Sequence, residues 1–322
     1  MINSSARANF SSMGLKRAFP VLALATTLLA RAVLAQDRPE HGPWNRDLYV
    51  SESADGLSFG KERLFVERGG VPTLVRDARG RLVAAFQWFP FDQRESFDRV
   101  AVMVSEDDGK SWSRPRTIQV EGLPSDFMRP FDPTLVLQEA GRLRLYFTSH
   151  SRERRAPAIY SAVSADGARY TFEPGMRFGV EGKPVIDCAV GRLGKQWHFF
   201  APVQGERGQG YHAISDDGRS FRRLENVSID GDRQWLGCAV TTEKGLRFLG
   251  SGRGGVWSAI SGDGAKWTLE DRSRGRHLDP GVARTTDGRW LLIGTGPLRA
   301  DAGPPPFDLR GLPVERSRPR SR

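Results

Sequence analysis

Short apolar stretches recur along the whole chain, and each is followed by a polar turn that contains glycine. Five of them precede a similar turn motif: RDLYV, RVAVMV, AIYSAV, GYHAI and GVWSAI. Five more follow it: RLFVE, RTIQVE, YTFE, FRRLE and WTLE. Short stretches bounded by glycine-containing turns are typical of β-hairpins. The 36 glycines and 20 prolines of the 322 residues fit an all-β chain of short strands.

The turn motif itself is a repeat. Its clearest copy is SEDDGKSW, with Ser105, Asp107, Gly109 and Trp112, and the other copies contain glycine at 56, 167, 218 and 264. A serine or aspartate side chain can bind the turn backbone, glycine supplies a positive φ, and the aromatic residue folds back onto the hairpin. The glycines are 53, 58, 51 and 46 residues apart. Self-similarity at about 40–50 residues is typical of propeller blades.

A second repeat lies between these turns. Five hairpin sequences begin at residues 71, 132, 186, 236 and 279, and each contains a short polar turn. The chain therefore starts with an outer hairpin (about 46 to 66) and ends with an inner hairpin (279 to 294). Each of these can complete the other. The sequence predicts a five-bladed β-propeller that is closed by pairing between the two ends of the chain, which leaves no free sheet edge.

The motif Ser-x-Asp-x-Gly-x-Ser/Thr-Trp, present in full in SEDDGKSW, resembles the Asp-box (BNR repeat) of sialidase-like propellers. This resemblance implies a structural role for Ser105, Asp107, Gly109 and Trp112, since the Asp-box lies on outer turns away from the active site. A six-bladed sialidase-like propeller is the alternative fold. The five-blade count resembles five-bladed glycoside hydrolases of the arabinanase, xylosidase and invertase type, in which carboxylates on the inner strands perform catalysis.

The strand order separates the two faces of the ring. The Asp-box turns and the short polar turns fall on one face, and the longer connections fall on the other. Asp132, Asp187 and Asp279 begin the innermost strands at this second face. Three convergent acids suit glycosidic cleavage, with one carboxyl as acid and another as base, because nearby like charges raise the pKa of the acid. The alternative is that Asp-Pro here is only strand-entry turn chemistry.

Residues on or near the same face are candidates for substrate binding. Arginines could bind an anionic sugar bidentately, and aromatic rings could stack on sugar faces. The predicted set is Arg129, Trp88, His150, Arg233, Trp235, Arg253, Arg276 and His277. We predict no metal site and no cofactor, since five histidines and two cysteines show no ligand spacing. The function predicted is an exported glycosidase-like propeller; the alternative is a non-catalytic propeller that binds carbohydrate or protein.

Residues 1–35 resemble a signal peptide, with a basic start, a short apolar run and small residues before position 36. We therefore expect a periplasmic or secreted protein with no transmembrane segment after cleavage. Residues 36–298 form the predicted propeller, and 299–322 a disordered Pro/Arg-rich tail. The formal charge of +10 comes mostly from the two ends, which argues against nucleic acid as a partner. We expect a monomer. Cys188 and Cys238 occupy matching positions in adjacent blades, either as a disulfide or as two buried thiols.

Overall fold

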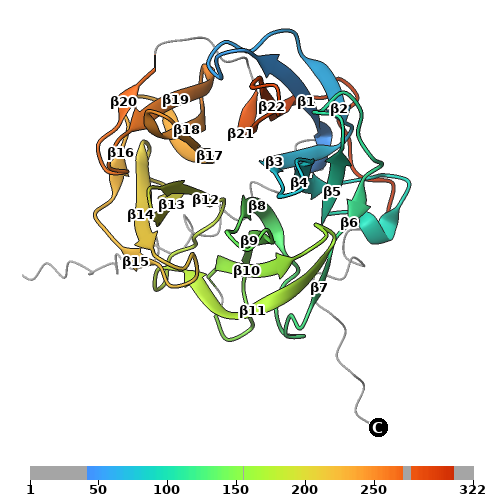
Figure 1. The fold of residues 1–322 in the computed structure, drawn as a ribbon. Helices are drawn as coiled ribbons and strands as arrows, with labels where there is room; N and C mark the ends of the chain where they lie inside the picture. The colour runs from blue at the N-terminus through green and yellow to red at the C-terminus, as the bar shows by residue number, and fades with distance from the viewer. Residues whose placement is uncertain (1–41, 155, 271–276, 308–322) are drawn as a thin grey trace, which may run out of the picture. The chain divides into compact units, whose positions relative to one another are not determined.

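A computed structural model describes residues 42–154, 156–270 and 277–307. These residues form five β-sheets arranged around a central channel (Figure 1). The prediction of a five-bladed propeller is confirmed, and the six-bladed alternative is wrong. The predicted signal peptide lies outside the described residues, as does the predicted tail from residue 308 onward. No helix among the described residues is both long enough and apolar enough to cross a membrane.

The strands of each blade run from the channel outwards in the following order. Blade 1 contains β21 (Leu278–Arg284), β22 (Trp290–Leu298), β1 (Arg46–Ser53) and β2 (Arg63–Val66). Blade 2 contains β3 (Gly69–Arg76), β4 (Leu82–Trp88), β5 (Arg99–Ser105) and β6 (Arg116–Thr117). Blade 3 contains β8 (Phe131–Leu137), β9 (Leu143–Ser149), β10 (Ala158–Ser164), β11 (Arg169–Phe178) and β7 (Gln119–Glu121).

Blade 4 contains β12 (Ala189–Leu193), β13 (Gln196–Pro202), β14 (Gln209–Ser215) and β15 (Arg222–Arg223), with β16 (Val227–Ser228) also paired to β14. Blade 5 contains β17 (Arg233–Thr242), β18 (Gly245–Gly252), β19 (Gly255–Ser261) and β20 (Thr268–Leu269). Among the described residues, two short 3₁₀ helices flank these strands: η2 (Pro43–Asn45) directly precedes β1, and η3 (Arg94–Ser96) lies between β4 and β5.

Blade 1 closes the ring in the way that the sequence predicts. Strand β1 pairs antiparallel with β22, so that Val50 lies opposite Ile293. Both side chains are buried together with residues of blade 2. Residues 299–307, which begin the predicted tail, also contact the propeller: the carbonyl of Gly303 accepts hydrogen bonds from the side chains of Trp44 and Asn45, both at 2.9 Å. Both ends of the described chain are therefore held at blade 1.

The five repeated turns share one hydrogen-bond pattern. In each, the serine hydroxyl donates to the aspartate Oδ1 at 2.8–3.0 Å and accepts the glycine N–H at 2.8–2.9 Å. Each glycine has a φ between 67° and 83°. In SEDDGKSW the hydrogen bonds from Ser111 hold the pKa of Asp107 near 2. Asp108 accepts the backbone N–H of Thr286 in blade 1 at 2.9 Å. Both aspartates thus act in turn and interblade contacts.

Ser105→Ala is expected to destabilise the protein by about 1–3 kcal/mol, because Ser105 is 1% exposed and its loss leaves the buried N–H of Gly109 without its acceptor. Urea unfolding of this variant measures the loss. The exposed Ser220 serves as a control when changed to alanine. A loss no larger than that of the control would contradict a structural role for the turn.

Candidate active site at the channel mouth

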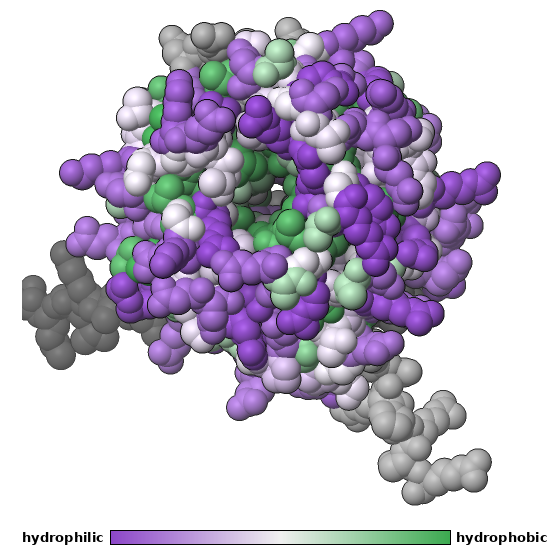
Figure 2. All heavy atoms as spheres, viewed as in Figure 1, coloured by the Kyte–Doolittle hydropathy of each residue, from purple (hydrophilic) through white to green (hydrophobic). Residues whose placement is uncertain are grey.

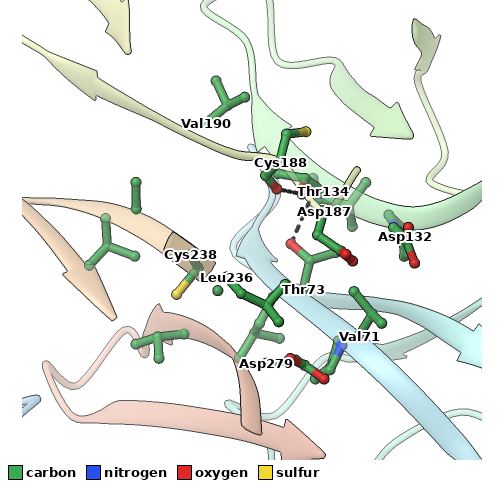
Figure 3. Close-up of a pocket in the computed structure, with 18 residues that line it drawn as sticks. Val71, Thr73, Asp132, Thr134, Asp187, Cys188, Val190, Leu236, Cys238 and Asp279 are labelled. Carbon is green, nitrogen blue, oxygen red and sulfur yellow. Dashed lines mark hydrogen bonds between the residues drawn. The ribbon is translucent and has the colours of Figure 1, made fainter. Parts of the chain in front are cut away.

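The three candidate acids lie at the opposite end of the blades from the repeated turns. In blade 3, Leu143 of β9 pairs with Ser164 at the turn end, while Thr148 pairs with Phe131 at the other end, next to Asp132. The inner strands of neighbouring blades pack against one another around the channel. Asp132, Asp187 and Asp279 therefore converge on one channel mouth (Figure 3). Figure 2 shows a central opening bordered by hydrophobic residues within a mostly hydrophilic face.

All three aspartates have a left-handed backbone, with φ of 50°, 54° and 49° for Asp132, Asp187 and Asp279. Val71, at the equivalent position of blade 2, has a φ of 48°. Strands β3, β8 and β21 carry a bulge or register shift at this point. Such bulges redirect side chains and are frequent next to active sites. The fold therefore imposes this conformation, and aspartate tolerates it better than a β-branched residue does.

Val71→Asn is expected to raise the free energy of unfolding by about 1 kcal/mol, because a β-branched residue is strained at positive φ and asparagine is not. Chemical denaturation measures the change. Val75→Asn, in the regular part of the same strand, is a control that we expect to be destabilising. A destabilised Val71→Asn variant would contradict the strain that the backbone angle indicates.

Hydroxyl groups from the second strand of the neighbouring blade hold these backbones in place. Thr148 Oγ1 accepts the N–H of Asp187 at 3.3 Å, and Ser251 Oγ accepts the N–H of Asp279 at 2.7 Å. Thr295 Oγ1 accepts the N–H of Val71 at 3.3 Å. None of these hydroxyls was among the residues predicted from the sequence. Their signal was a serine or threonine near the end of a second strand, in LYFTS, FLGSG and LIGTG.

Burial raises the pKa of all three acids, and repulsion by neighbouring carboxylates adds to the shift of Asp132 and Asp187. Burial is the largest cause for each. The pKa of Asp132 rises to about 7, and that of Asp187 rises well above its usual range because Asp132 and Asp279 add negative charge. The interaction between the Asp132 and Asp187 carboxyls favours the charged form of Asp132 and the neutral form of Asp187. These interactions favour the protonated form of Asp187 over that of Asp132.

The positive charge of Arg129 lowers the pKa of Asp132 and so favours its charged form. Its guanidinium forms an ion pair with Asp98, and Nε donates to the Asp98 carbonyl at 2.6 Å. Gln87 also donates to the Asp98 side chain, at 2.7 Å. Among the described residues, Arg129 Nη1 and Gln87 Oε1 are buried without a hydrogen-bond partner. Arg129 is thus fixed by Asp98 and retains one free donor nitrogen.

The other predicted binding residues lie in different environments. Trp235 is fully buried, donates to the Gly208 carbonyl at 3.0 Å and packs against Phe248 and Trp257. His277 is 2% exposed, near Glu62 and Tyr49. We leave these two enclosed side chains, and the 9% exposed Trp88, out of the site proposed below.

Three polar residues of the predicted set remain. His150 is half-buried, and its Nδ1 lies 3.4 Å from the carbonyl of Ser151. Arg233 pairs with Asp230 at 2.9 Å, and Arg253 pairs with Asp232 at 3.4 Å. Arg276 lies outside the described residues. A binding role for these residues stays a prediction.

The two cysteines are both free thiols, which excludes the disulfide alternative in this structure. Cys188 and Cys238 line the channel beside the acids (Figure 3), and burial raises the pKa of Cys238 to about 12. Among the described residues, no group of three or more histidine, cysteine, aspartate or glutamate side chains could hold a metal ion.

Two cavities contact the acids. The channel between the inner strands contains about 40 Å³ of free space beside Asp132, Asp187 and Asp279. A pocket of about 330 Å³ opens at the mouth between blades 5 and 1, and Asp279, Ser251 and Leu236 line part of it. A sugar unit is too large for the first space and fits the second, so Asp279 is the acid next to open volume.

Comparisons with solved structures identify the same architecture. The chain is similar to a glycosyl hydrolase from Bacteroides ovatus (TM-score 0.53, 15% identity, 74% of this chain and 87% of that one). A Dyadobacter fermentans protein of unknown function gives a TM-score of 0.53 at 14% identity, over 83% and 88% of the two chains.

A family 32 β-fructofuranosidase from Bombyx mori gives a TM-score of 0.52 at 13% identity, over 82% of this chain and 60% of that one. No protein-family profile and no curated protein matches the sequence. At these identities the likeness shows the fold alone: a five-bladed β-propeller whose structural neighbours include glycoside hydrolases.

Proposed function

We propose that this protein hydrolyses glycosidic bonds at the channel mouth, with Asp132, Asp187 and Asp279 as its catalytic acids. The observation that carries this proposal is the convergence of three acids with raised pKa on one channel mouth, where Asp279 also lines an open pocket. A carboxyl that stays protonated at neutral pH can act as a general acid. The glycoside hydrolases among the structural neighbours support the proposal as fold analogy.

The three acids receive different roles because their surroundings differ. Two glycosidase carboxyls that flank a bond are about 5–9.5 Å apart, whereas Asp132 and Asp187 are close enough to change each other's pKa directly. We therefore treat this pair as one proton-donating unit, with Asp187 protonating the leaving oxygen and Asp132 stabilising the proton. Asp279 is the base or nucleophile, since it lines the pocket where water and sugar have room. Ser251 orients it through the hydroxyl contact to Oδ1 at 3.2 Å.

A non-catalytic carbohydrate-binding propeller is the second candidate. One observation favours it: the space beside Asp132 and Asp187 is about 40 Å³, close to the volume of one water molecule. A sugar must then approach these acids from the mouth pocket rather than enter the channel. If it cannot do so, the protein binds glycan at the mouth without cleaving it. We retain export from the sequence prediction as part of both candidates.

Two measurements on one glycan panel separate these candidates. Binding is measured on a glycan array, and cleavage is measured as reducing-sugar release by wild-type protein and by the Asp132→Asn/Asp279→Asn double variant. The enzyme proposal predicts release from at least one bound glycan and loss of release in the double variant. Binding without release would support the binding propeller, and equal release by both proteins would refute catalysis by these acids.

A further inference from the structure

A further hollow, apart from the two cavities at the acids, lies between blades 2 and 3. It encloses about 840 Å³ beside β6 and β7, the outermost strands of these two blades (Figure 1). Arg99 and Val100 line it at one end of β5, and Ser105 of a repeated turn lies at the other end. The hollow is therefore at the same end of the blades as the three acids. Its volume is in the range of about 300–1,000 Å³ that is usual for small-molecule sites.

Part of the lining is a firmly held apolar surface. Ile118, Val120 and Phe127 are half-buried, and they pack against the hydrophobic core that blades 2 and 3 share. The Phe127 ring also meets the Tyr160 ring edge to face, with centroids 5.0 Å apart. A ring that its neighbours already hold in place can stack on a ligand with little further loss of side-chain entropy.

Polar groups line the same hollow. The side chains of Glu95, Gln119 and Glu121 are exposed there, and their carboxylate and amide oxygens can accept hydrogen bonds. Thr117 adds a hydroxyl group. A sugar ring presents an apolar C–H face together with hydroxyl groups around its edge. Apolar surface and hydrogen-bond acceptors in one hollow match both parts of such a ring.

The charged groups of the hollow do not favour an anion. Glu95 and Glu121 supply two carboxylates, and Arg99 and Arg129 supply two guanidinium groups. Arg129 is already paired with a third carboxylate, that of Asp98. The described groups at this place thus include three negative and two positive charges. Uronates and sulfated sugars are therefore not attracted, and neutral sugars are the class of glycan that the hollow suits.

An extended peptide is the other ligand that a hollow beside two edge strands could hold. A peptide that adds to a sheet edge gains most of its affinity from hydrogen bonds to the strand backbone. Strand β6 contains two residues and β7 contains three, so each edge offers few such bonds. The short edges favour a ligand that is held through side chains.

We propose that the hollow between blades 2 and 3 binds a segment of a neutral glycan, which stacks on Phe127 and donates hydroxyl hydrogen bonds to Gln119 and Glu121. This inference rests on the proposed function and extends it, because it narrows the ligand to neutral glycans and gives the chain a place to bind apart from the acids. Arg129, which lines the hollow, precedes Asp132 by three residues.

Isothermal titration calorimetry with the neutral tetrasaccharides of xylan, arabinan, mannan and cellulose tests the hollow. Tetragalacturonate is the charged comparison, and the peptide Lys-Thr-Val-Thr-Lys is the peptide comparison. The starting protein is Asp132→Asn/Asp279→Asn, which binds substrate without cleaving it under the proposed function. It receives either Gln119→Ala/Glu121→Ala or the control pair Gln196→Ala/Glu243→Ala, two exposed residues at the turn end of the blades. Circular dichroism melting checks that each protein is folded.

The expected result is that at least one neutral tetrasaccharide binds, with an affinity that falls at least fivefold in Gln119→Ala/Glu121→Ala and changes less than twofold in the control. Raising the salt concentration should leave this affinity unchanged, because the ligand is uncharged. Equal affinity in the two variants, binding of tetragalacturonate or the peptide alone, or failure of every neutral tetrasaccharide to bind would each overturn the inference.

Reducing-sugar release in the wild-type background tests the proposed function separately. Binding that depends on Gln119 and Glu121 without any release would keep the hollow as a glycan site and refute catalysis. Release with a KM that Gln119→Ala/Glu121→Ala leaves unchanged would keep catalysis and overturn the hollow. If both hold, this variant should raise KM at least fivefold and leave kcat within twofold, because the hollow does not contact the bond that is cleaved.

Discussion

Asp187→Asn is expected to lower kcat for the hydrolysed glycan about a thousandfold while the protein remains folded. Asparagine keeps the size of the side chain and can still hydrogen-bond to Asp132, but it has no proton to give to the leaving oxygen. General acid–base catalysis contributes about 10²–10⁴ to the rate, and the raised pKa of Asp187 favours its protonated form, which a general acid requires. The initial rate of reducing-sugar release measures the effect.

Two controls accompany this rate measurement. Asp92→Asn, an exposed aspartate in a connection before η3, should retain full activity. A substrate with a good leaving group, such as a nitrophenyl glycoside, should restore part of the rate of Asp187→Asn, because such a leaving group does not need protonation. Activity of Asp187→Asn within threefold of wild type would contradict the assignment of Asp187 as the acid.

Asp132→Asn is expected to stabilise the protein in alkaline solution by about 2–4 kcal/mol. The pKa of Asp132 is about 7 in the folded protein and 3.8 for an ordinary aspartate, so the folded state binds its proton more tightly. The stability of the wild type therefore falls as pH rises from about 4 to about 7. Asparagine has no charge to bury, so the variant does not lose this stability. Denaturant unfolding between pH 4 and pH 8.5 measures the difference.

The difference in unfolding free energy between variant and wild type at each pH cancels the contribution of other titrating groups. His198 and His212 form a buried pair with nitrogens 3.1 Å apart, and burial lowers the pKa of both, to about 4 for His212. They destabilise the folded state as pH falls below about 6.5, equally in both proteins. Asp187, Asp279 and Arg129 are the charged groups that act on Asp132. A stability difference that stays flat with pH, or that declines toward pH 8.5, would contradict the raised pKa.

The architecture could be predicted from the sequence because each copy of a repeat forms the same local structure. The five copies of the turn motif gave the number of blades. The unmatched hairpins at the two ends of the chain predicted the pairing of β1 with β22. The convergence of Asp132, Asp187 and Asp279 followed for the same reason, since equivalent positions in a ring meet at its axis. Which of the three acids most favours its protonated form could not be predicted, because this depends on the burial and neighbours of each carboxyl.

The environment of single side chains was harder to predict. Trp235 and His277 have polar tips that suit a ligand, but contacts within and between the blades enclose them, and no local pattern reports such contacts. The left-handed backbone at Val71 could not be predicted either, because a β-branched residue such as valine is rarely found at positive φ.

We propose, as the centre of this mechanism, that Asp132 and Asp187 share a proton near neutral pH that is available for acid catalysis. Carboxyl ¹³C NMR of protein labelled at aspartate tests it without knowledge of the substrate, through titration from pH 3 to pH 9 with Asp132→Asn and Asp187→Asn for assignment. The account predicts two coupled aspartate resonances that still titrate at or above pH 6 and are changed together by either substitution. Titration of every aspartate below pH 5 would contradict it.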